Sequence, residues 1–123
     1  MGFLVTYNWR TEGQYFPVRL GKNYIGAGHV SSEVDHPKCQ ILIETDQMLS
    51  AEHALILCRG GVHGTFELID QKSSNGTFLN DKPVPISGTA LPNYGLIRTG
   101  STDWIFVMVE PEGASGTTSS SSS

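Results

Sequence analysis

Ser50 and His53 are the residues of this sequence whose types and spacing could support nucleophilic chemistry. A serine nucleophile needs a base within hydrogen-bond reach, an acid that orients the base, and donors that stabilise an oxyanion. No Gly-x-Ser-x-Gly turn surrounds Ser50, and no Asp or Glu has a position that assigns it the orienting role. We therefore expect a protein that is not an enzyme and has no catalytic residues.

Metal chemistry would have to come from His36 and Cys39, with His53 or Cys58 as further ligands. These residue types suit zinc, but a recognisable zinc site has two paired ligand spacings and this sequence has a single His-x-x-Cys pair. We expect no metal site. The two isolated cysteines are expected to be thiols rather than a disulfide, as is usual in a cytoplasmic chain.

Four short motifs rich in glycine, serine and asparagine point to binding instead. They cover residues 24–28, 49–54, 70–80 and 94–100. Each lies between stretches that are typical of strands, in the loops where binding residues concentrate. The sequence therefore predicts a recognition surface made of several loops.

The elements that must position these motifs are short strands. β-Branched and aromatic residues recur between turn signals, no stretch has the period of an amphipathic helix, and fourteen glycines and six prolines separate the runs. We expect an all-β, antiparallel β-sandwich, with Phe66, Leu68, Trp104, Phe106 and Met108 in its core. The ten predicted strands are Phe3–Tyr7, Tyr15–Leu20, Asn23–Ile25, Gln40–Ile43, His53–Leu57, Gly64–Ile69, Thr77–Leu79, Lys82–Val84, Gly95–Arg98 and Trp104–Val109.

The length of 123 residues fits one domain. We expect the folded domain to cover residues 1–110 and residues 111–123 to form a flexible tail or linker, because this Gly-, Ser- and Thr-rich stretch has no large apolar side chain to bury. Such a tail suggests a module of a larger protein.

The net charge of −4 and the scattered basic residues argue against nucleic acid as a partner. No apolar run approaches the roughly 20 residues that a membrane span needs. The residues after Met1 lack the basic start and long apolar stretch of a secretory signal. We therefore expect a cytoplasmic protein whose partner is neither nucleic acid nor membrane.

In this order and spacing, the motifs resemble the forkhead-associated (FHA) domain family, and the resemblance covers about Tyr24 to Gly100. It implies a β-sandwich of about eleven strands whose loops at one end bind phosphothreonine peptides, with no catalysis and no cofactor. The motifs that carry it are Ile25-Gly26 before a loop, Ser50-x-x-His53, and Asp70-x-x-Ser73-x-Asn75-Gly76-Thr77 followed by Asn80.

The resemblance also implies roles for individual residues. Ser50 would donate its hydroxyl to a phosphate oxygen, Ser74 would be a second polar neighbour, and Asn75 would hold the backbone of a bound peptide. Three residues would support the loops rather than bind the ligand, namely Gly26, His53 and Gly76.

The sequence departs from the family at its phosphate-binding arginine, whose position is Ala27, and at Ala51, where a basic or amide side chain is common. A hydrogen bond to a charged partner contributes about 1.5–3 kcal/mol, so loss of the arginine alone would weaken binding roughly ten- to a hundredfold. Lys72 or His29 could supply a replacement charge, whereas the acidic residues of segment 31–38 would repel a phosphate.

Two functions follow from these residues. The first is a protein interaction module that binds a protein or peptide through its loops with weak or no phosphate dependence. The alternative is a phosphothreonine-peptide reader in signalling that uses Ser50, Ser74 and Asn75, with Lys72 or His29 supplying the charge.

Overall fold

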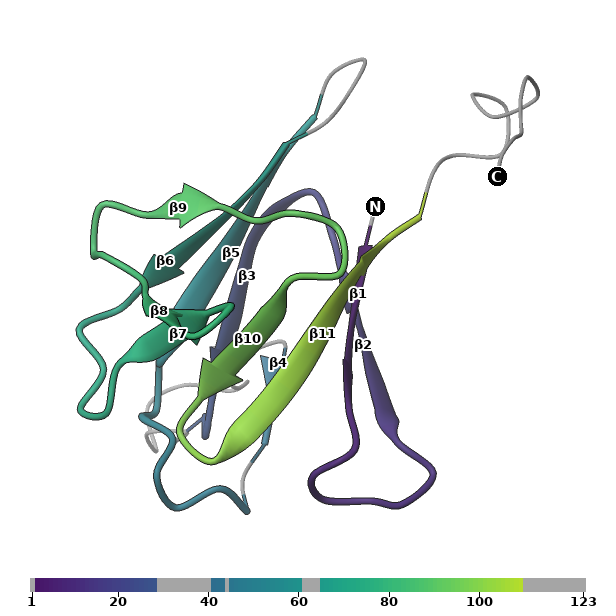
Figure 1. Ribbon diagram of the computed structural model, residues 1–123, viewed down its shortest axis with the longest axis vertical. Helices are drawn as coiled ribbons and strands as arrows, with labels where there is room; N and C mark the ends of the chain where they lie inside the picture. The colour runs from purple at the N-terminus through teal and green to yellow at the C-terminus, as the bar shows by residue number, and fades with distance from the viewer. Residues whose placement is uncertain (1, 29–40, 44, 61–64, 110–123) are drawn as a thin grey trace, which may run out of the picture.

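The computed structural model describes residues 2–28, 41–43, 45–60 and 65–109, and in these residues eleven strands form two sheets (Figure 1). The strands are β1 (Gly2–Thr6), β2 (Gln14–Val18), β3 (Gly21–Gly26), β4 (Ile41–Leu42), β5 (Ala54–Arg59), β6 (Thr65–Asp70), β7 (Thr77–Leu79), β8 (Lys82–Pro83), β9 (Thr89–Ala90), β10 (Leu96–Thr99) and β11 (Thr102–Met108). The predicted all-β sandwich is confirmed. No helix of the described residues is long and apolar enough to span a membrane.

The two sheets have six and five strands. The six-stranded sheet has the order β2-β1-β11-β10-β7-β8, and the five-stranded sheet has the order β4-β3-β5-β6-β9. Neighbouring strands are antiparallel except β3 and β4, which pair in parallel at Ile25–Ile41 and Gly26–Leu42. Each of the ten predicted runs overlaps a strand, and β9 is the additional one.

The core lies between the sheets because apolar residues alternate along the strands, as residues must to share one face. In β11, Trp104 and Phe106 are fully buried while Ile105 and Val107 lie on the other face. Phe66 and Leu68 are also buried, as predicted.

Met108, which was predicted to lie in the core, is 37% exposed. It is the last residue of β11 and pairs with Gly2, which has no side chain to cover it. The space above Gly2 is filled by the ring of Phe106, whose Cε1 would lie 2.7 Å from a Cβ at that position. Buried and exposed residues therefore alternate along β11 up to Phe106, and this alternation ends at Met108.

Several connections gather at one end of the sandwich. The β1–β2, β4–β5 and β6–β7 connections and the β10–β11 turn all lie toward the lower end in Figure 1, whereas β1 begins and β11 ends at the upper end. The sequence motifs around Ser50 and Asn75 belong to the β4–β5 and β6–β7 connections. The fold thus brings the two motifs to the same end.

Candidate functional site

His53 joins the two motif-bearing loops from a fully buried position. Its Nδ1 accepts a hydrogen bond from the Ser50 N–H at 3.1 Å, so the ring proton resides on Nε2 and is donated to the Gly76 carbonyl at 2.8 Å. Its own backbone N–H bonds to Ile25, and its carbonyl accepts from Gln71. The imidazole therefore connects the β4–β5 loop to the β6–β7 loop.

Ser50 and Ser74 lie side by side across these two loops. The Ser74 N–H donates to Ser50 Oγ at 3.1 Å, and the Ser50 carbonyl accepts from the Ala27 N–H at 3.0 Å. As an acceptor in this bond, Ser50 Oγ keeps its own proton for another partner. Ser74 is exposed, and its backbone N–H contacts the Ser50 hydroxyl at the loop end of the sandwich.

Asp70 closes the β6–β7 loop below these hydroxyls. Its Oδ1 accepts from the Ser73 and Thr77 hydroxyls, both at 2.6 Å, and its Oδ2 accepts from the Ser73 N–H at 3.2 Å. Partial burial acts to raise the pKa of Asp70, but these hydrogen bonds together outweigh it and hold the pKa below its ordinary value of 3.8. The loop is thus tied at its base by a carboxylate that prefers to stay ionised.

Asn75 and Gly76 form the exposed tip of this loop. Asn75 Nδ2 donates to the Met48 carbonyl at 2.8 Å, which leaves its Oδ1 and one amide hydrogen without a partner among the described residues. Gly76 has φ of +83°, the left-handed conformation that favours glycine. The amide expected to hold a peptide backbone is therefore oriented by the neighbouring loop and still has a donor and an acceptor available.

The predicted residues of the glycine motif lie at the end of β3. Gly26 is the last residue of β3 rather than a loop residue, and its carbonyl accepts from the Ile43 N–H at 3.1 Å. The left-handed turn comes two residues later, at Gly28, which has φ of +64°. Gly28 N–H bonds to the Ala51 carbonyl at 3.1 Å, so this segment runs beside the β4–β5 loop.

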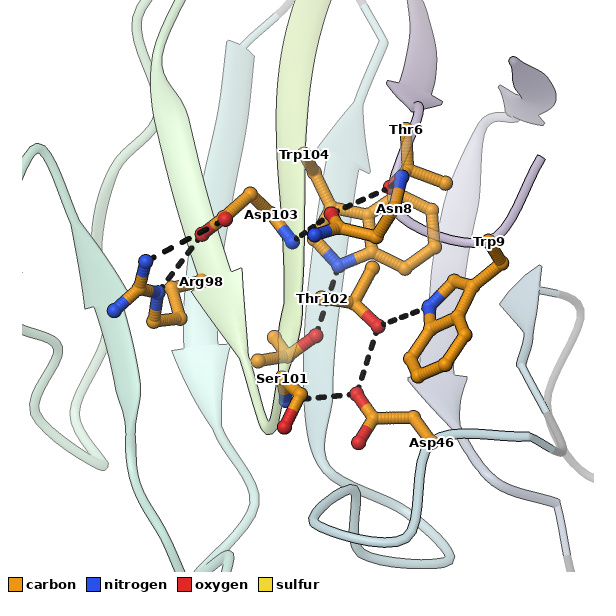
Figure 2. A network of polar contacts seen from close by, with 10 residues as sticks. Thr6, Asn8, Trp9, Asp46, Arg98, Ser101, Thr102, Asp103 and Trp104 are labelled. Carbon is orange, nitrogen blue, oxygen red and sulfur yellow. Dashed lines mark hydrogen bonds and ion pairs between the residues drawn. The ribbon is translucent and has the colours of Figure 1, made fainter. Parts of the chain in front are cut away.

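Asp46 is a site-supporting residue that the sequence analysis missed. It is almost fully buried, and its carboxylate accepts from the Met48 N–H at 2.9 Å. It also accepts from the Ser101 N–H at 2.8 Å and the Thr102 hydroxyl at 2.7 Å (Figure 2). Trp9 Nε1 in turn donates to the Thr102 hydroxyl at 2.8 Å. The network shapes the turn just before Ser50, but its partners are 55 and 56 residues away in sequence, so local patterns could not reveal it.

The β10–β11 turn packs closely beneath this network. Gly100 has φ of +60°, and a Cβ there would lie 2.8 Å from Asp46 Oδ2, from the Leu49 backbone nitrogen and from the Met48 backbone carbon. Real Cβ atoms do not approach backbone atoms so closely, so the β4–β5 loop rests directly on this glycine. The position of Ser50 therefore depends on a turn fifty residues further along the chain.

Positive charge is sparse at this end of the molecule. Lys72 is the one lysine or arginine in the described parts of the β3–β4, β4–β5 and β6–β7 connections, and it is exposed with φ of +57°. The β1–β2 connection at the same end carries one more exposed basic residue, Arg10. Ala27 packs its side chain against the edge of the hydrophobic core. His29 lies outside the described residues.

The geometry around His53 does not favour a serine nucleophile. Both ring nitrogens of His53 are bonded to backbone groups, and neither is bonded to Ser50 Oγ, so the histidine is not placed as a base for that hydroxyl. Cys58 is a free, buried thiol of the core, and the described residues contain no cluster of three metal-ligating side chains. His36 and Cys39 lie outside the described residues.

Comparison with solved structures places this fold among FHA domains. A structure from the structural and functional analysis of phosphothreonine-dependent FHA domain interactions aligns with a TM-score of 0.71 and 26% identity, over 89% of this chain and 98% of that one. The FHA domain of FhaA, complexed with the intracellular domain of Rv3910, aligns with a TM-score of 0.69 and 26% identity, over 86% and 99%. The FHA domain of CT664 from Chlamydia trachomatis aligns at 0.70 with 19% identity, over 89% and 98%.

The sequence comparison agrees with the structural one. No curated protein matches this chain. The FHA domain family profile matches residues 18–102, which contain both loops joined by His53. FHA domains are non-catalytic binding modules. The chain belongs to the FHA domain family.

Proposed function

We propose that this FHA domain is a protein interaction module that binds a protein or peptide segment through its β4–β5 and β6–β7 loops, with weak or no dependence on phosphate. The proposal rests on the groups that the site contains and on the charged group that it lacks. The Ser50 hydroxyl accepts from the Ser74 N–H and the Asn75 amide donates to the Met48 carbonyl, so both polar groups are held in place. The position where the family has its phosphate-binding arginine is Ala27, which packs against the core.

The retained groups suit a peptide backbone. Asn75 has an acceptor and a donor available, which is the pairing that a peptide unit of an extended ligand requires. Ser50 keeps its hydroxyl proton, and Ser74 offers an exposed hydroxyl beside it. These neutral donors and acceptors can all bind the polar groups of an unphosphorylated peptide, so none of them requires a phosphate.

The absence of an arginine at position 27 decides how much a phosphate group would add to the binding affinity. Phosphate recognition by arginine is strong because the guanidinium makes charge-assisted, often bidentate hydrogen bonds. Ala27 offers no donor beyond its backbone N–H, which is already bonded to the Ser50 carbonyl. The acidic net charge of −4 adds no general attraction for a phosphate.

Calorimetry against phosphothreonine peptides and their unphosphorylated twins tests the proposal. We expect dissociation constants weaker than about 100 μM for the phosphopeptides, in contrast to the low micromolar values of tight modules, and a small difference within each pair of twins. A phosphopeptide bound in the low micromolar range whose twin does not bind would overturn it.

The variant Ala27→Arg tests the same point from the opposite side. The new side chain can extend its methylene groups along the core edge and carry its charge into the solvent near Ser50. We expect phosphopeptide binding to strengthen at least about tenfold, because a charge-assisted contact is restored. Ala27→Gln, which adds length without charge, is the control and is expected to give little gain. An equal gain with both variants would show that charge is not what the site lacks.

The second candidate function, a phosphothreonine-peptide reader in signalling, is favoured by the place of Lys72. This exposed residue lies in the same loop as Ser74 and Asn75, and His29 is the other candidate for the charge. Solved relatives support this candidate, because one of them comes from an analysis of phosphothreonine-dependent FHA interactions. If Lys72 carries phosphate binding, Lys72→Gln will abolish the preference for phosphorylated peptides; under the main proposal it changes their affinity little.

The partner class follows from the family. Homologous FHA domains bind phosphothreonine peptides of partner proteins, and we propose a protein partner here as well, with this domain serving as one module of a larger cytoplasmic protein.

A further inference from the structure

The outer face of the six-stranded sheet is apolar, although the outer face of an antiparallel sheet is normally polar. The strand pairing aligns Tyr15, Val5, Ile105 and Leu96 in one row across β2, β1, β11 and β10. A second row next to it contains Pro17, Phe3 and Val107. Leu96 is 56% exposed. Apolar side chains gathered in this way on a surface mark an interaction site more often than scattered ones do.

This face is also hollowed. A pocket of about 600 Å³ lies over β1, β11, β10 and β7, and Val5, Ile105, Leu96 and Phe78 form its apolar wall. Its volume lies in the range of sites that bind small groups or peptide side chains. It is separate from the hydroxyl cluster of Ser50.

The charged rim of the pocket is acidic overall. Arg98 donates to Asp103 through Nε at 2.8 Å and through Nη2 at 3.4 Å (Figure 2), and Asp81 also lines the pocket. The hydrogen bond to Asp103 is the main cause that raises the pKa of Arg98, and the charge of Asp81 adds to it. One guanidinium thus faces two carboxylates, which leaves a net negative charge that suits a basic group on the occupant.

The size of the face favours a peptide segment over a second copy of the chain. Five neighbouring strands of three to seven residues, about 16 Å long on average at roughly 3.3 Å per residue and spaced by roughly 4.8 Å, give a face of roughly 400 Å². A stable complex buries roughly 800 Å² on each partner, about twice this area. An extended segment of about six residues matches the face instead.

Phe78 lies between the pocket and the loop that carries Asn75. The Phe78 ring lines the pocket, and its Cε1 would lie 3.4 Å from a Cβ at Gly76. Gly76 directly follows Asn75. A bound segment that passes over the loop tip therefore meets the Phe78 ring and then the apolar wall.

We propose that this pocket binds an extended segment of a partner protein in which a leucine, isoleucine or phenylalanine lies beside a lysine or arginine, without any phosphate. The apolar side chain fills the space between Leu96, Ile105 and Phe78, and the basic side chain pairs with Asp81 or Asp103. This inference depends on the proposed function in one respect: it assumes that the segment belongs to the same partner protein that the loops bind.

The probe is a display library of unphosphorylated twelve-residue peptides, selected on the intact chain and measured by fluorescence anisotropy. We expect enrichment of apolar–basic pairs, and affinity at least tenfold weaker for Leu96→Ser because a leucine-sized contact is lost. Leu20→Ser is the matched control: Leu20 is 73% exposed in the β2–β3 connection, at the other end of the sandwich, and its variant is expected to bind like the wild type. Asp81→Asn should weaken only peptides that carry the basic residue.

Three results would overturn the proposal. One is a library without apolar–basic enrichment, and another is binding that Leu96→Ser leaves unchanged. The third is Leu96-dependent self-association in light scattering, which would assign the face to a second copy. NMR shifts on peptide binding separate the two proposals: shifts at Leu96 and Ile105 report the pocket, whereas shifts confined to residues 71–76 support the loop site and reject the pocket.

Discussion

The two loops of the proposed site are each held by a single polar side chain, the buried His53 and the half-buried Asp70. His53 links the Ser50 N–H to the Gly76 carbonyl, and Asp70 ties the base of the β6–β7 loop through Ser73 and Thr77. Both act on backbone groups or hydroxyls that lie next to the binding residues. Because a buried polar group left without a partner costs about 1–3 kcal/mol, these contacts fix the loop conformation before any ligand arrives.

Replacement of Gly76 by valine tests the loop tip. A β-branched residue at φ of +83° is strained, so we expect the free energy of unfolding to fall by about 1–3 kcal/mol and peptide binding to weaken. Urea denaturation and calorimetry measure the two effects. Gly76→Asn is the control, since asparagine tolerates this conformation and the nearest atoms to an added Cβ, at 3.4 Å and 3.6 Å, leave room for it. Equal stability of the valine variant and the wild type would refute the strained turn.

The depressed pKa of Asp70 predicts a pH dependence. The ionised carboxylate is stabilised in the folded state, so its contribution to stability is complete above 3.8 and is lost as the pH falls through the lower pKa of the folded protein. Asp70→Asn should therefore lower the free energy of unfolding most at neutral pH, and the difference from the wild type should shrink below pH 3.8. Urea denaturation across the acidic range measures it, and a difference that stays constant to pH 2 would contradict this assignment.

Sequence patterns predicted some of these residues and missed others for a physical reason. Ser50, His53 and Asn75 stand in short motifs whose spacing is visible locally. The role of Asp46 depends on contacts with Ser101 and Thr102, which no spacing in the sequence reveals. Local motifs therefore identify the groups that face the ligand better than the buried groups that orient them.

At the scale of elements, the β10–β11 turn supports the β4–β5 loop. Asp46 connects the two, and Gly100 allows the backbones to approach. Trp9 extends the contact to the β1–β2 connection through Thr102. Three connections from distant parts of the sequence therefore form one unit at the loop end.

Gly100→Ala tests this unit. The new Cβ would meet backbone atoms of the β4–β5 loop at 2.8 Å, so the loop must shift, and we expect a loss of about 1–3 kcal/mol in stability together with weaker peptide binding. Thermal denaturation and calorimetry check both. In the control, Gly60→Ala, the nearest atom is the flexible Leu20 side chain at 3.2 Å, and little change is expected. An alanine at position 100 that leaves both quantities unchanged would show that the loops are independent.

The strands were more predictable than their ends. Long alternating runs such as Trp104–Val109 predict strands because one face must be buried. Thr89–Ala90, which forms β9, is too short to alternate, and its pairing with Leu68 and Glu67 is a tertiary effect. The exposure of Met108 likewise depends on Gly2, its partner on β1.

For the molecule as a whole, the residues that stabilise the fold and the residues proposed to contact a partner lie in different parts of the sandwich. The core between the sheets fixes the strands, and the loop end and the outer face of the six-stranded sheet are the two surfaces that we propose for a partner. The all-β class and the family were predictable from composition and motifs. The apolar outer face was not, because its residues come from five strands and show their common surface only once the strand order is known.

Removal of the residues after Pro111 tests the predicted domain limit. Residues 112–123 contain no apolar side chain larger than alanine, so we expect the melting temperature to stay within about 2 °C of the intact chain, which corresponds to a few tenths of a kcal/mol. Differential scanning calorimetry gives the comparison. A fall of about 10 °C would show that the tail packs on the domain.

The hydrogen bond from Trp9 to Thr102 makes the intrinsic fluorescence of Trp9 a probe of the loop end. The chain has two tryptophans: Trp104 is fully buried, with its ring edge-to-face with Phe16, whereas Trp9 is 38% exposed beside the network that holds the β4–β5 loop. We expect a ligand bound at Ser50, as proposed, to change the polarity around the exposed indole and to leave the buried one as a constant background. The emission of the unlabelled protein is then expected to follow occupancy of the loops.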